Sequence, residues 1–526
     1  MGVEKTRMTG GEALLRTLCE GGADLYLANP GTSEMHLVEA LDRVDGLRPV
    51  LGLFEGVLSG AADGYARMTG RPAITLFHLG PGLANGLANL HNARRAMVPM
   101  VNLVGEHTAA HLPKDPPLAS DIESLARPMS HWVRRNQSAA TLAEDGAAAL
   151  AAALAPPGRI ATLIVPADSA WQDVQGPVPH AKPPVPPRVP MDRVREIATV
   201  LRRKEPAALL AGTSALRDPG LVTAGRIAAK TGARLLCGTF PARISRGAGR
   251  PRVDRIPYFP ERAAEFLAGL RHIVLAGDRM TVPFFGYPTI SSEIVPPGCE
   301  LHTLAAVEDD VTGALDALAA ELGAEQTEPS IERPARPQIE DAPITPEAVA
   351  RVLGALLPEG AIVSDEGATS SLGTLPATAG APPHDWLFLT GGAIGQGVPV
   401  ATGAALACPD RKVITLEGDG SGMYTIQALW TQAREKLDVT TIIFANRSYA
   451  ILGMELTRMA NAMPSDRTRG LIDLGNPDVD WVSLARGLGV EGERVTSLRD
   501  FEQKLASALR GRGPRLLEVP IGARPR

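Results

Sequence analysis

The stretch LEGDGSGMY, residues Leu416–Tyr424, and the later stretch TTIIFANRSYAILG, residues Thr440–Gly453, decide the fold of this chain. In the first, an apolar run ends in a glycine-rich turn around Asp419, and in the second a similar run ends at Asn446. The residues between them, 425–436, have a helical pattern. Apolar runs of this length bounded by glycine suit strands buried on both faces. The stretch therefore predicts a strand–helix–strand unit of a parallel α/β sheet.

The polar residues of this unit are candidates for a magnesium site. Ligands of parallel α/β sheets sit at the carboxyl ends of strands, which is where Asp419 and Asn446 both fall. Their side-chain oxygens, with a backbone carbonyl near Ser448, are hard ligands of the kind that Mg²⁺ prefers, and phosphate oxygens and water usually complete its shell. Gly418 and Gly420 lack a Cβ, so a phosphate can approach the backbone closely. The alternative is an ordinary turn at a strand end.

The same alternation of apolar runs and helical patterns extends along the whole chain. The proline-rich stretches Gln175–Pro190 and Glu325–Ile344 are predicted linkers, because proline removes backbone donors and disfavours helix. They divide the chain into expected domains at residues 1–175, 191–325 and 344–526. We expect three α/β domains, each a mostly parallel sheet flanked by helices. The predicted strands are Ala73–Phe77, Met100–Gly105, Ala161–Pro166, Ala207–Gly212, Ala233–Gly238, His272–Gly277, Ala361–Glu366, Trp386–Gly392, Lys412–Gly420, Thr440–Asn446 and Arg515–Pro520.

The composition excludes several classes of function. With 53 basic and 58 acidic residues, the net charge of −5 offers no general attraction for nucleic acid or an anionic membrane. Aromatic residues are only 4% of the chain, so stacking on bases is not expected either. The four cysteines are scattered and form no CxxC pair, which fits a reduced setting rather than a disulfide framework or a cysteine zinc site. We therefore expect a cytoplasmic protein with a small-molecule substrate.

The Gly-Asp-Gly turn followed by an asparagine resembles the diphosphate-binding motif of thiamine-diphosphate enzymes. The resemblance implies thiamine diphosphate and Mg²⁺ as cofactors, with Asp419, Asn446 and Ser448 at the metal. The family has a second asparagine after the first, whereas this chain has Arg447, so the side-chain role of that position stays open. The implied contacts to the cofactor in this region are Gly418, Asp419, Gly420, Ser421, Asn446, Ser448 and Tyr449.

Residues Leu53–His107 resemble the pyrimidine-binding domain of the same family, in which a glutamate opens a helix ending in ADGYAR.TG, here Ala62–Gly70. The match implies that Glu55 hydrogen-bonds N1′ of the aminopyrimidine and so activates the cofactor. Taken alone, Glu55 also fits a surface residue at a helix start, favoured by the helix dipole. In this family the glutamate and the metal motif come from different subunits. The resemblance therefore implies a homodimer with active sites at the interface, and a dimer of dimers as the larger assembly.

A third match, LTGGAIGQGVPVATGAAL at Leu389–Leu406, resembles the loop that presses a large aliphatic residue under the cofactor. Ile394 would impose the bent form of the coenzyme, and Gly392 would offer its carbonyl to the amino group. The segment DEGATSS lies where the family's diphosphate loop lies, so Thr369 and Ser370 are further candidates for cofactor binding.

The branch that the chain resembles contains benzoylformate decarboxylase and acetolactate synthase large subunits. Thr32 matches a serine that holds the substrate carboxylate in benzoylformate decarboxylase, although a helix N-cap explains it equally well. His78 matches a histidine that could bind substrate or move protons, and a structural histidine is the alternative. The second histidine of that enzyme is absent here, with Phe284 or Phe285 as the nearest equivalent. We hypothesise that the missing proton donor favours carboligation.

The resemblance implies an enzyme that cleaves or forms the carbon–carbon bond next to the 2-oxo group of a small 2-oxo acid, by decarboxylation with or without carboligation. Two alternatives stay open. One is a non-catalytic subunit of the same fold, and the other is a flavin-containing oxidoreductase, since some relatives carry FAD in the middle domain. The sequence has no GK dipeptide, which excludes a P-loop, and no GxSxG nucleophile elbow.

Overall fold

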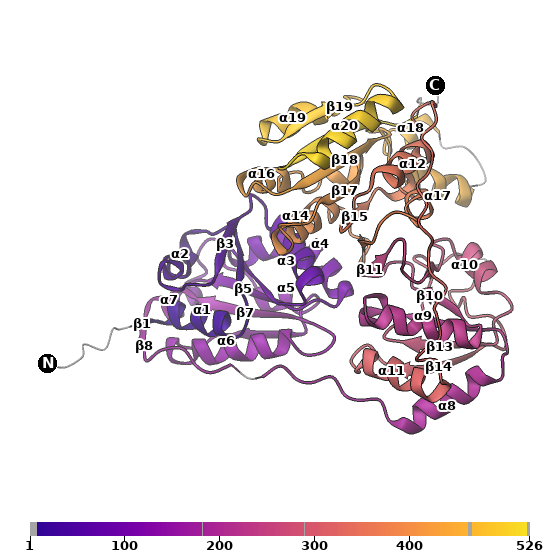
Figure 1. The fold of residues 1–526 in the computed structure, drawn as a ribbon. Helices are drawn as coiled ribbons and strands as arrows, with labels where there is room; N and C mark the ends of the chain where they lie inside the picture. The colour runs from indigo at the N-terminus through magenta and orange to yellow at the C-terminus, as the bar shows by residue number, and fades with distance from the viewer. Residues whose placement is uncertain (1–7, 181, 289, 461–464, 523–526) are drawn as a thin grey trace.

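The apolar runs of the sequence form the strands of three mostly parallel sheets, one in each third of the chain (Figure 1). The structure is a computed structural model that describes residues 8–180, 182–288, 290–460 and 465–522. The predicted fold class is confirmed, and each predicted strand is present, either with the predicted bounds or with bounds that differ by a few residues. The described residues of both proline-rich stretches lie outside the helices and named strands, as expected for linkers.

The N-terminal unit is a six-stranded parallel sheet in the order β3-β2-β4-β5-β7-β6. The four central strands of this sheet are buried on both faces, because helices cover both sides of the sheet. The strands are β2 Leu25–Ala28, β3 Arg48–Leu51, β4 Ala73–Phe77, β5 Met100–Glu106, β6 Trp132–Arg135 and β7 Ile160–Pro166. The helices are α1 Gly10–Glu20, α2 Met35–Ala40, α3 Glu55–Thr69, α4 Leu79–Ala96, α5 Ile122–Ala126, α6 Ala139–Ala153 and α7 Ala167–Trp171, and a small antiparallel pair joins β1 Met8–Thr9 to β8 Asp173–Val174.

The middle unit is a five-stranded parallel sheet in the order β12-β10-β9-β13-β14. The edge strand β14 escapes sequence-based prediction because Glu300, His302 and Thr303 in its first four residues are polar, which breaks the apolar run. The strands are β9 Ala207–Ala211, β10 Arg234–Cys237, β12 Asp254–Arg255, β13 His272–Ala276 and β14 Glu300–Ala305. The helices are α8 Met191–Arg202, α9 Gly220–Thr231, α10 Pro260–Leu267 and α11 Val311–Leu322.

The C-terminal unit is a seven-stranded sheet in the order β11-β16-β15-β17-β18-β20-β19. Its edge strand β11, Arg243–Arg246, comes from the middle third of the chain and pairs antiparallel with β16. The other strands are β15 Ile362–Glu366, β16 His384–Phe388, β17 Val413–Gly418, β18 Val439–Ala445, β19 Glu491–Arg494 and β20 Arg515–Pro520. The helices are α12 Pro346–Leu356, α13 Thr374–Ala377, α14 Gly397–Ala407, α15 Asp419–Gly422, α16 Ala428–Arg434, α17 Ala450–Ala460, α18 Asp466–Arg469, α19 Trp481–Gly487 and α20 Leu498–Arg510.

Helices α3 and α14 pack closely against each other through small residues, and this contact joins the N-terminal unit to the C-terminal unit. A Cβ on Gly64 of α3 would lie 2.0 Å from the carbonyl oxygen of Val400 in α14, and one on Gly403 would lie 1.8 Å from the carbonyl oxygen of Ala61. Glycine at these positions lets the two backbones approach more closely than any other residue allows. Because Glu55 begins α3, this contact fixes where the start of that helix points.

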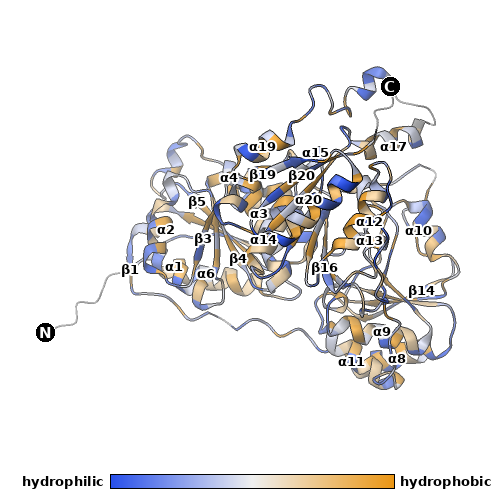
Figure 2. Ribbon diagram, turned by 45° about the horizontal axis from the view of Figure 1, so that its top comes forward, coloured by the Kyte–Doolittle hydropathy of each residue, from blue (hydrophilic) through white to orange (hydrophobic). Residues whose placement is uncertain are grey.

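Hydropathy follows the layers of the fold. In Figure 2 the strands are mostly orange, whereas blue residues line the outer faces of helices and the connecting segments. In the described part of the chain, no helix combines the length and the apolar character that crossing a membrane requires.

Candidate active site

The carboxyl ends of β17 and β18 bring the predicted metal ligands together. Asp419 is only 5% exposed, and its Oδ2 accepts a hydrogen bond of 2.5 Å from the backbone N–H of Arg447. The Oδ1 of Asn446 accepts from the N–H of Ser448 at 2.9 Å, which leaves the second lone pair of that oxygen for a ligand. Arg447 has a φ of +58°, a strained conformation for a residue with a side chain. The turn thus closes around Asp419.

The glycine-rich turn differs in detail from the prediction. The strand predicted for Lys412–Gly420 ends at Gly418 in the structure, and Asp419 already begins the short helix α15. The helix predicted for residues 425–436 is shorter than expected, since α16 covers Ala428–Arg434. The Oγ of Ser421 donates to Glu417 at the end of β17. A Cβ on Gly420 would lie 2.3 Å from Cε1 of Tyr449, so this glycine makes room for the tyrosine ring beside Asp419.

A buried pair of carboxylates lies directly behind this turn, and sequence reasoning missed it. Glu366 and Glu417 are register partners on the neighbouring parallel strands β15 and β17, and they are 3% and 0% exposed. Glu366 accepts hydrogen bonds from the backbone N–H groups of Gly395 and Gly397. A Cβ on Gly397 would lie 2.2 Å from Glu417 Oε2 and 3.1 Å from Glu366 Oε2, so the two side chains converge on one point.

The electrostatics of this pair follow from its burial. Burial raises the pKa of Glu366 to about 7, although the N–H donors around it act in the opposite direction. Burial and then the charge of Glu366 raise the pKa of Glu417 well above its ordinary value. Glu417 Oε2 also has no hydrogen-bond partner. At neutral pH the pair therefore retains a proton, because two adjacent buried carboxylates cannot both ionise cheaply.

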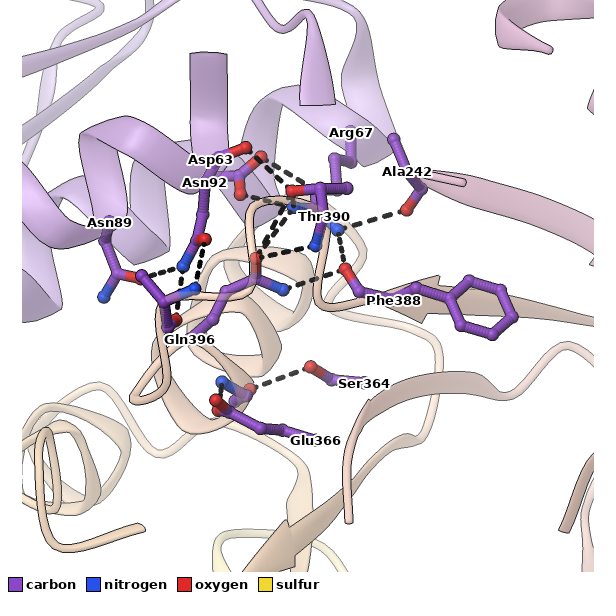
Figure 3. Close-up of polar contacts among 12 residues, drawn as sticks. Asp63, Arg67, Asn89, Asn92, Ala242, Ser364, Glu366, Phe388, Thr390 and Gln396 are labelled. Atoms are coloured by element: carbon purple, nitrogen blue, oxygen red, sulfur yellow. Dashed lines mark hydrogen bonds and ion pairs between the residues drawn. The ribbon is translucent and has the colours of Figure 1, made fainter. Parts of the chain in front are cut away.

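Helices α3 and α4 hold the loop between β16 and α14 from the side of the N-terminal unit (Figure 3). The guanidinium of Arg67, 1% exposed, pairs with Asp63 and donates to the Phe388 carbonyl at 2.7 Å and to Thr390 Oγ1 at 3.0 Å. Asn92 donates to the carbonyl of Ala393 at 2.7 Å. These contacts correct the prediction of a strand through residue 392: the chain leaves the sheet after Phe388 because buried side chains of another unit bind its backbone.

The same loop carries Gly392 and Ile394, the predicted neighbours of the coenzyme. Both are half-buried. Asn89 of α4 donates to the carbonyl of Gly395 at 3.0 Å and to that of Gly56 at 2.8 Å. Gly56 directly follows Glu55, so one amide connects the start of α3 to this loop within a single chain.

Glu55 is a buried carboxylate at the first position of α3, 7% exposed. Its Oε2 accepts a hydrogen bond of 3.0 Å from Asn85 Nδ2, in the second turn of α4. A Cβ on Gly82 would lie 3.2 Å from Glu55 Oε1 and 3.3 Å from His78 Cβ. Glu55 and His78, 23 positions apart in the sequence, therefore lie next to each other around this glycine.

His78 is oriented by a residue that the sequence reasoning did not name. Its Nδ1 lies 2.8 Å from Oε2 of Glu34, which is 1% exposed, and 3.3 Å from Oγ of Ser33. Glu34 also accepts from the N–H of Gly31 at 2.8 Å. Thr32 is exposed and makes no capping hydrogen bond, so its N-cap interpretation is wrong. A search for the capping motif [ST]-x-x-[DE] does not find this pair, because Glu34 follows Thr32 by two residues and the motif requires three.

An aromatic cluster of the middle unit reaches the predicted cofactor loop. A Cβ on Gly392 would lie 2.4 Å from Cζ of Phe284. The Phe284 ring packs against those of Phe285, Tyr258 and Phe240, with centroids 4.7, 5.5 and 5.8 Å apart. Of the two phenylalanines considered in place of a proton-donating histidine, Phe284 lies against the loop at Gly392.

The remaining candidates lie in the short turn after β15. Ser370 is buried, and Thr369, within the turn of residues 368–370, is half-buried. They follow Glu366 by three and four positions, at the same sheet edge as Asp419.

The residues at this edge fit a divalent cation and a diphosphate. Burial raises the pKa of Asp419 to about 6 even though backbone N–H groups lower it, so the carboxylate is incompletely compensated. A divalent cation would supply that compensation, and carboxylate and amide oxygens are its usual protein ligands.

A parallel α/β architecture with polar residues gathered at the strand ends is typical of proteins that bind a ligand at that edge of the sheet. Two family models match the chain: the thiamine pyrophosphate enzyme N-terminal TPP binding domain at residues 8–126, and the corresponding C-terminal TPP binding domain at residues 372–519. Across 522 residues, the chain is 52% identical to "Putative acetolactate synthase large subunit IlvX" of Mycobacterium tuberculosis, covering 98% of this chain and 99% of that protein. The chain therefore belongs to the thiamine pyrophosphate-dependent enzyme family.

More distant relatives carry different names. Benzoylformate decarboxylase of Pseudomonas aeruginosa is 29% identical over 535 residues, which cover 95% of this chain and 96% of that enzyme. Among solved structures, the thiamine diphosphate-dependent 4-hydroxybenzoylformate decarboxylase of Rhodococcus jostii RHA1 superposes with a TM-score of 0.85 at 25% identity, covering 98% and 99% of the two chains. The family thus includes decarboxylases and acetolactate synthases among the relatives of this chain.

Proposed function

We propose that this protein is a thiamine-diphosphate- and Mg²⁺-dependent enzyme that decarboxylates a small 2-oxo acid and joins the remaining fragment to a second carbonyl compound. When bound, thiamine diphosphate would supply a nucleophilic carbon for the 2-oxo group and an electron sink for the pair of the carbon–carbon bond that breaks as carbon dioxide leaves. The observation that carries the carboligation outcome is the apolar Phe284, which contacts Gly392 where a decarboxylase would present a proton donor.

Glu55 would hold the proton that activates the coenzyme. Its carboxylate is buried, and Asn85 anchors one oxygen at 3.0 Å, which fixes the direction of the other. A carboxylate held in this way can share a proton with a ring nitrogen without losing its orientation. Asp419, Asn446 and the Ser448 carbonyl would hold Mg²⁺ and the diphosphate, with the N–H groups of the Gly418–Ser421 turn directed at the phosphate oxygens.

His78 would meet the substrate through Nε2. Because Nδ1 faces the buried acceptor Glu34 at 2.8 Å, Nδ1 is engaged with that carboxylate and Nε2 is the ring nitrogen left for the substrate. Nε2 can then accept a proton or a hydrogen bond at the reacting end of the substrate, beside Glu55. Glu34 is a positioning residue in this scheme, since it acts only through the ring.

Product analysis tests the proposal. Purified protein with thiamine diphosphate and Mg²⁺ is supplied with a panel of 2-oxo acids that includes pyruvate and benzoylformate, and ligated products and free aldehydes are quantified together. We expect ligated product to dominate. The variant Phe284→His should raise the share of free aldehyde, whereas Phe240→His, in the same aromatic cluster with its ring centroid 5.8 Å from that of Phe284, should leave the ratio unchanged. Free aldehyde as the sole product of the unmodified protein would contradict the carboligation proposal.

A non-catalytic subunit is distinguished in the same experiment. It would show a rise in melting temperature on adding thiamine diphosphate with Mg²⁺, but no turnover of any 2-oxo acid in the panel. A Glu55→Gln variant is the matched reference, because it removes the proton-holding group and keeps the shape of the side chain.

A second candidate, a flavin-containing enzyme of the same family, is favoured by one observation. A cavity of 410 Å³ lies between the three units at the carboxyl ends of the middle strands, lined by Gly212, Gly238 and Gly277 together with Arg67, Phe284 and Thr390. Its volume is within the usual range for a ligand pocket. The absorption spectrum of the purified protein tests this directly, because bound flavin absorbs visible light and thiamine diphosphate does not.

The proposed assembly is a homodimer, or a dimer of dimers, with each active site shared between subunits. The proposal rests on the family membership. Sedimentation velocity with and without cofactor tests it, and an active monomer would refute it. A mixture of the Glu55→Gln and Asp419→Asn variants should regain turnover that neither has alone, because hybrid dimers contain one intact shared site.

A further inference from the structure

Two histidines and a glutamate meet at the amino-terminal ends of β13 and β14, in the middle unit. His272 begins β13 and is the register partner of Glu300, which begins β14. His302 follows Glu300 by two positions, so both side chains lie on the same face of the strand. One ligand atom from each of the three residues falls within 4.8 Å of the others.

The three separations are those of metal ligands. His272 Nδ1 lies 3.1 Å from His302 Nε2, and each of these nitrogens lies 3.5 Å from Glu300 Oε2. Ligands at about 2.0 to 2.2 Å from a tetrahedral Zn²⁺ are separated from one another by about 3.3 to 3.6 Å. Both distances to Glu300 lie within this range and the distance between the two nitrogens is slightly shorter, so the triangle is close to one face of a zinc coordination shell.

The surroundings of the triangle also suit a metal. The second ring nitrogen of His272, Nε2, lies 2.9 Å from Oε2 of Glu205, the carboxylate–histidine arrangement that orients metal-binding imidazoles. His272 is 4% exposed and His302 13%, so their rings are held, whereas Glu300 at 64% leaves a path from solvent. Three carboxylates outnumber two guanidinium groups in the local field, namely Glu196, Glu205 and Glu300 against Arg203 and Arg271.

A hydrogen bond between the two histidines explains only part of this geometry. One proton between His272 Nδ1 and His302 Nε2 accounts for their distance of 3.1 Å. It does not account for Glu300 Oε2, which lies equally far from both nitrogens although hydrogen bonding would draw it to the one that carries a proton. A cation at the centre is attracted to all three atoms at once.

We propose that His272, His302 and Glu300 bind one divalent d-block cation, Zn²⁺ in the first place, with water as the fourth ligand. Imidazole and carboxylate ligands suit zinc and its neighbours in the series rather than Mg²⁺ or Ca²⁺. The site lies at the opposite end of β13 from Gly277, which lines the cavity between the units. The cation site is therefore separate from the proposed cofactor site. A bound cation stabilises the fold, because it joins the exposed edge strand β14 to β13.

The test uses the full chain, stripped with a chelator and returned to buffer containing thiamine diphosphate and excess Mg²⁺. Zn²⁺ is then titrated in competition with a chromophoric chelator. We expect one Zn²⁺ per chain and a higher melting temperature on binding. His302→Gln and Glu300→Gln should each weaken binding at least tenfold and abolish the shift in melting temperature, and Glu205→Gln should weaken binding less.

The control is the double variant His107→Gln/His111→Gln, which removes the other close pair of histidines, with ring centroids 5.7 Å apart. It should bind Zn²⁺ like the unmodified chain. X-ray absorption of the loaded protein should show two imidazole nitrogens at the metal. Absence of stoichiometric binding at micromolar Zn²⁺ overturns the proposal, and so does binding that survives Glu300→Gln, a substitution at an exposed position that the fold tolerates.

Discussion

Replacing Glu417 by glutamine should stabilise the protein, and the gain should grow with pH. The folded chain keeps a proton on Glu417, because burial and the neighbouring Glu366 raise its pKa well above the ordinary value. The unfolded chain releases that proton above about pH 4.5, the ordinary range of a glutamic acid. Glutamine is neutral in both states and has nearly the same shape, so the variant removes the difference in protonation and little else.

The magnitude follows from linkage. A group whose folded-state pKa is raised contributes its full stability below the unfolded pKa, and that contribution is lost as the pH rises towards the folded pKa. While only the folded state holds the proton, each pH unit lowers the free energy of unfolding by about 1.4 kcal/mol. Over the pH range in which only the folded state holds the proton, the unmodified chain therefore loses stability at this rate relative to Glu417→Gln. For a domain of about 150 to 250 residues, a change of about 1 kcal/mol in the free energy of unfolding corresponds to a shift of roughly 2 to 4 °C in melting temperature.

The assay is differential scanning calorimetry of the cofactor-free protein at pH 5, 6 and 7. The transition of Glu417→Gln should nearly coincide with that of the unmodified chain at pH 5 and should lie several degrees above it at pH 7. Glu328→Gln is the control, because Glu328 is exposed in a linker and its substitution should give no pH-dependent difference. A difference independent of pH, or a variant that is less stable at pH 7, would refute the protonated pair.

Three further predictions concern the site and the packing around it. Asp419→Asn should weaken binding of thiamine diphosphate with Mg²⁺ at least tenfold by titration calorimetry. Burial raises the pKa of Asp419 to about 6, so a proton competes with the cation below about pH 6. The metal affinity of the unmodified chain should therefore fall as the pH drops below about 6 and stay constant above it. Glu55→Gln should lower kcat at least a hundredfold while the melting temperature stays within about 2 °C, since the amide keeps the packing at α3 and only the proton-holding group is lost. Gly64→Ala should destabilise the protein by about 1 to 3 kcal/mol in denaturant unfolding, because its Cβ would lie 2.0 Å from the Val400 carbonyl oxygen, whereas Gly487→Ala, with no atom within 4 Å of the new Cβ, should be nearly neutral.

The central strands could be predicted because each is a buried apolar run bounded by turn residues. β4 at Ala73–Phe77 has the predicted bounds, and β18 at Val439–Ala445 differs by one residue at each end. Edge strands were missed where one side faces solvent, as in β14, whose first residue is the exposed Glu300. β11 was missed for another reason: it is antiparallel and pairs with a strand from a different third of the chain, and no local pattern encodes that partner.

The candidate site divides along the same line. The Gly-Asp-Gly turn and the asparagine after the next strand pointed to one edge of the sheet as the candidate metal site, because residues at the carboxyl ends of neighbouring parallel strands must converge. Glu366 and Glu417 also follow apolar runs, but only the register of β15 against β17 makes them neighbours. Likewise, Glu34 is an ordinary acidic residue in the sequence until the fold places it 2.8 Å from His78.

The sequence by itself determined the class of fold, the apolar runs that become the central strands, and the family motifs around Glu55 and Asp419. These are local properties, since burial and turn formation leave their pattern in consecutive residues. The tertiary structure alone decided which charged groups lie together: the carboxylate pair behind the turn at Asp419, the guanidinium of Arg67 against the loop after β16, and the histidines of β13 and β14 beside Glu300. Protonation and metal affinity depend on distances of a few ångströms across strands and units, and chain order does not contain those distances.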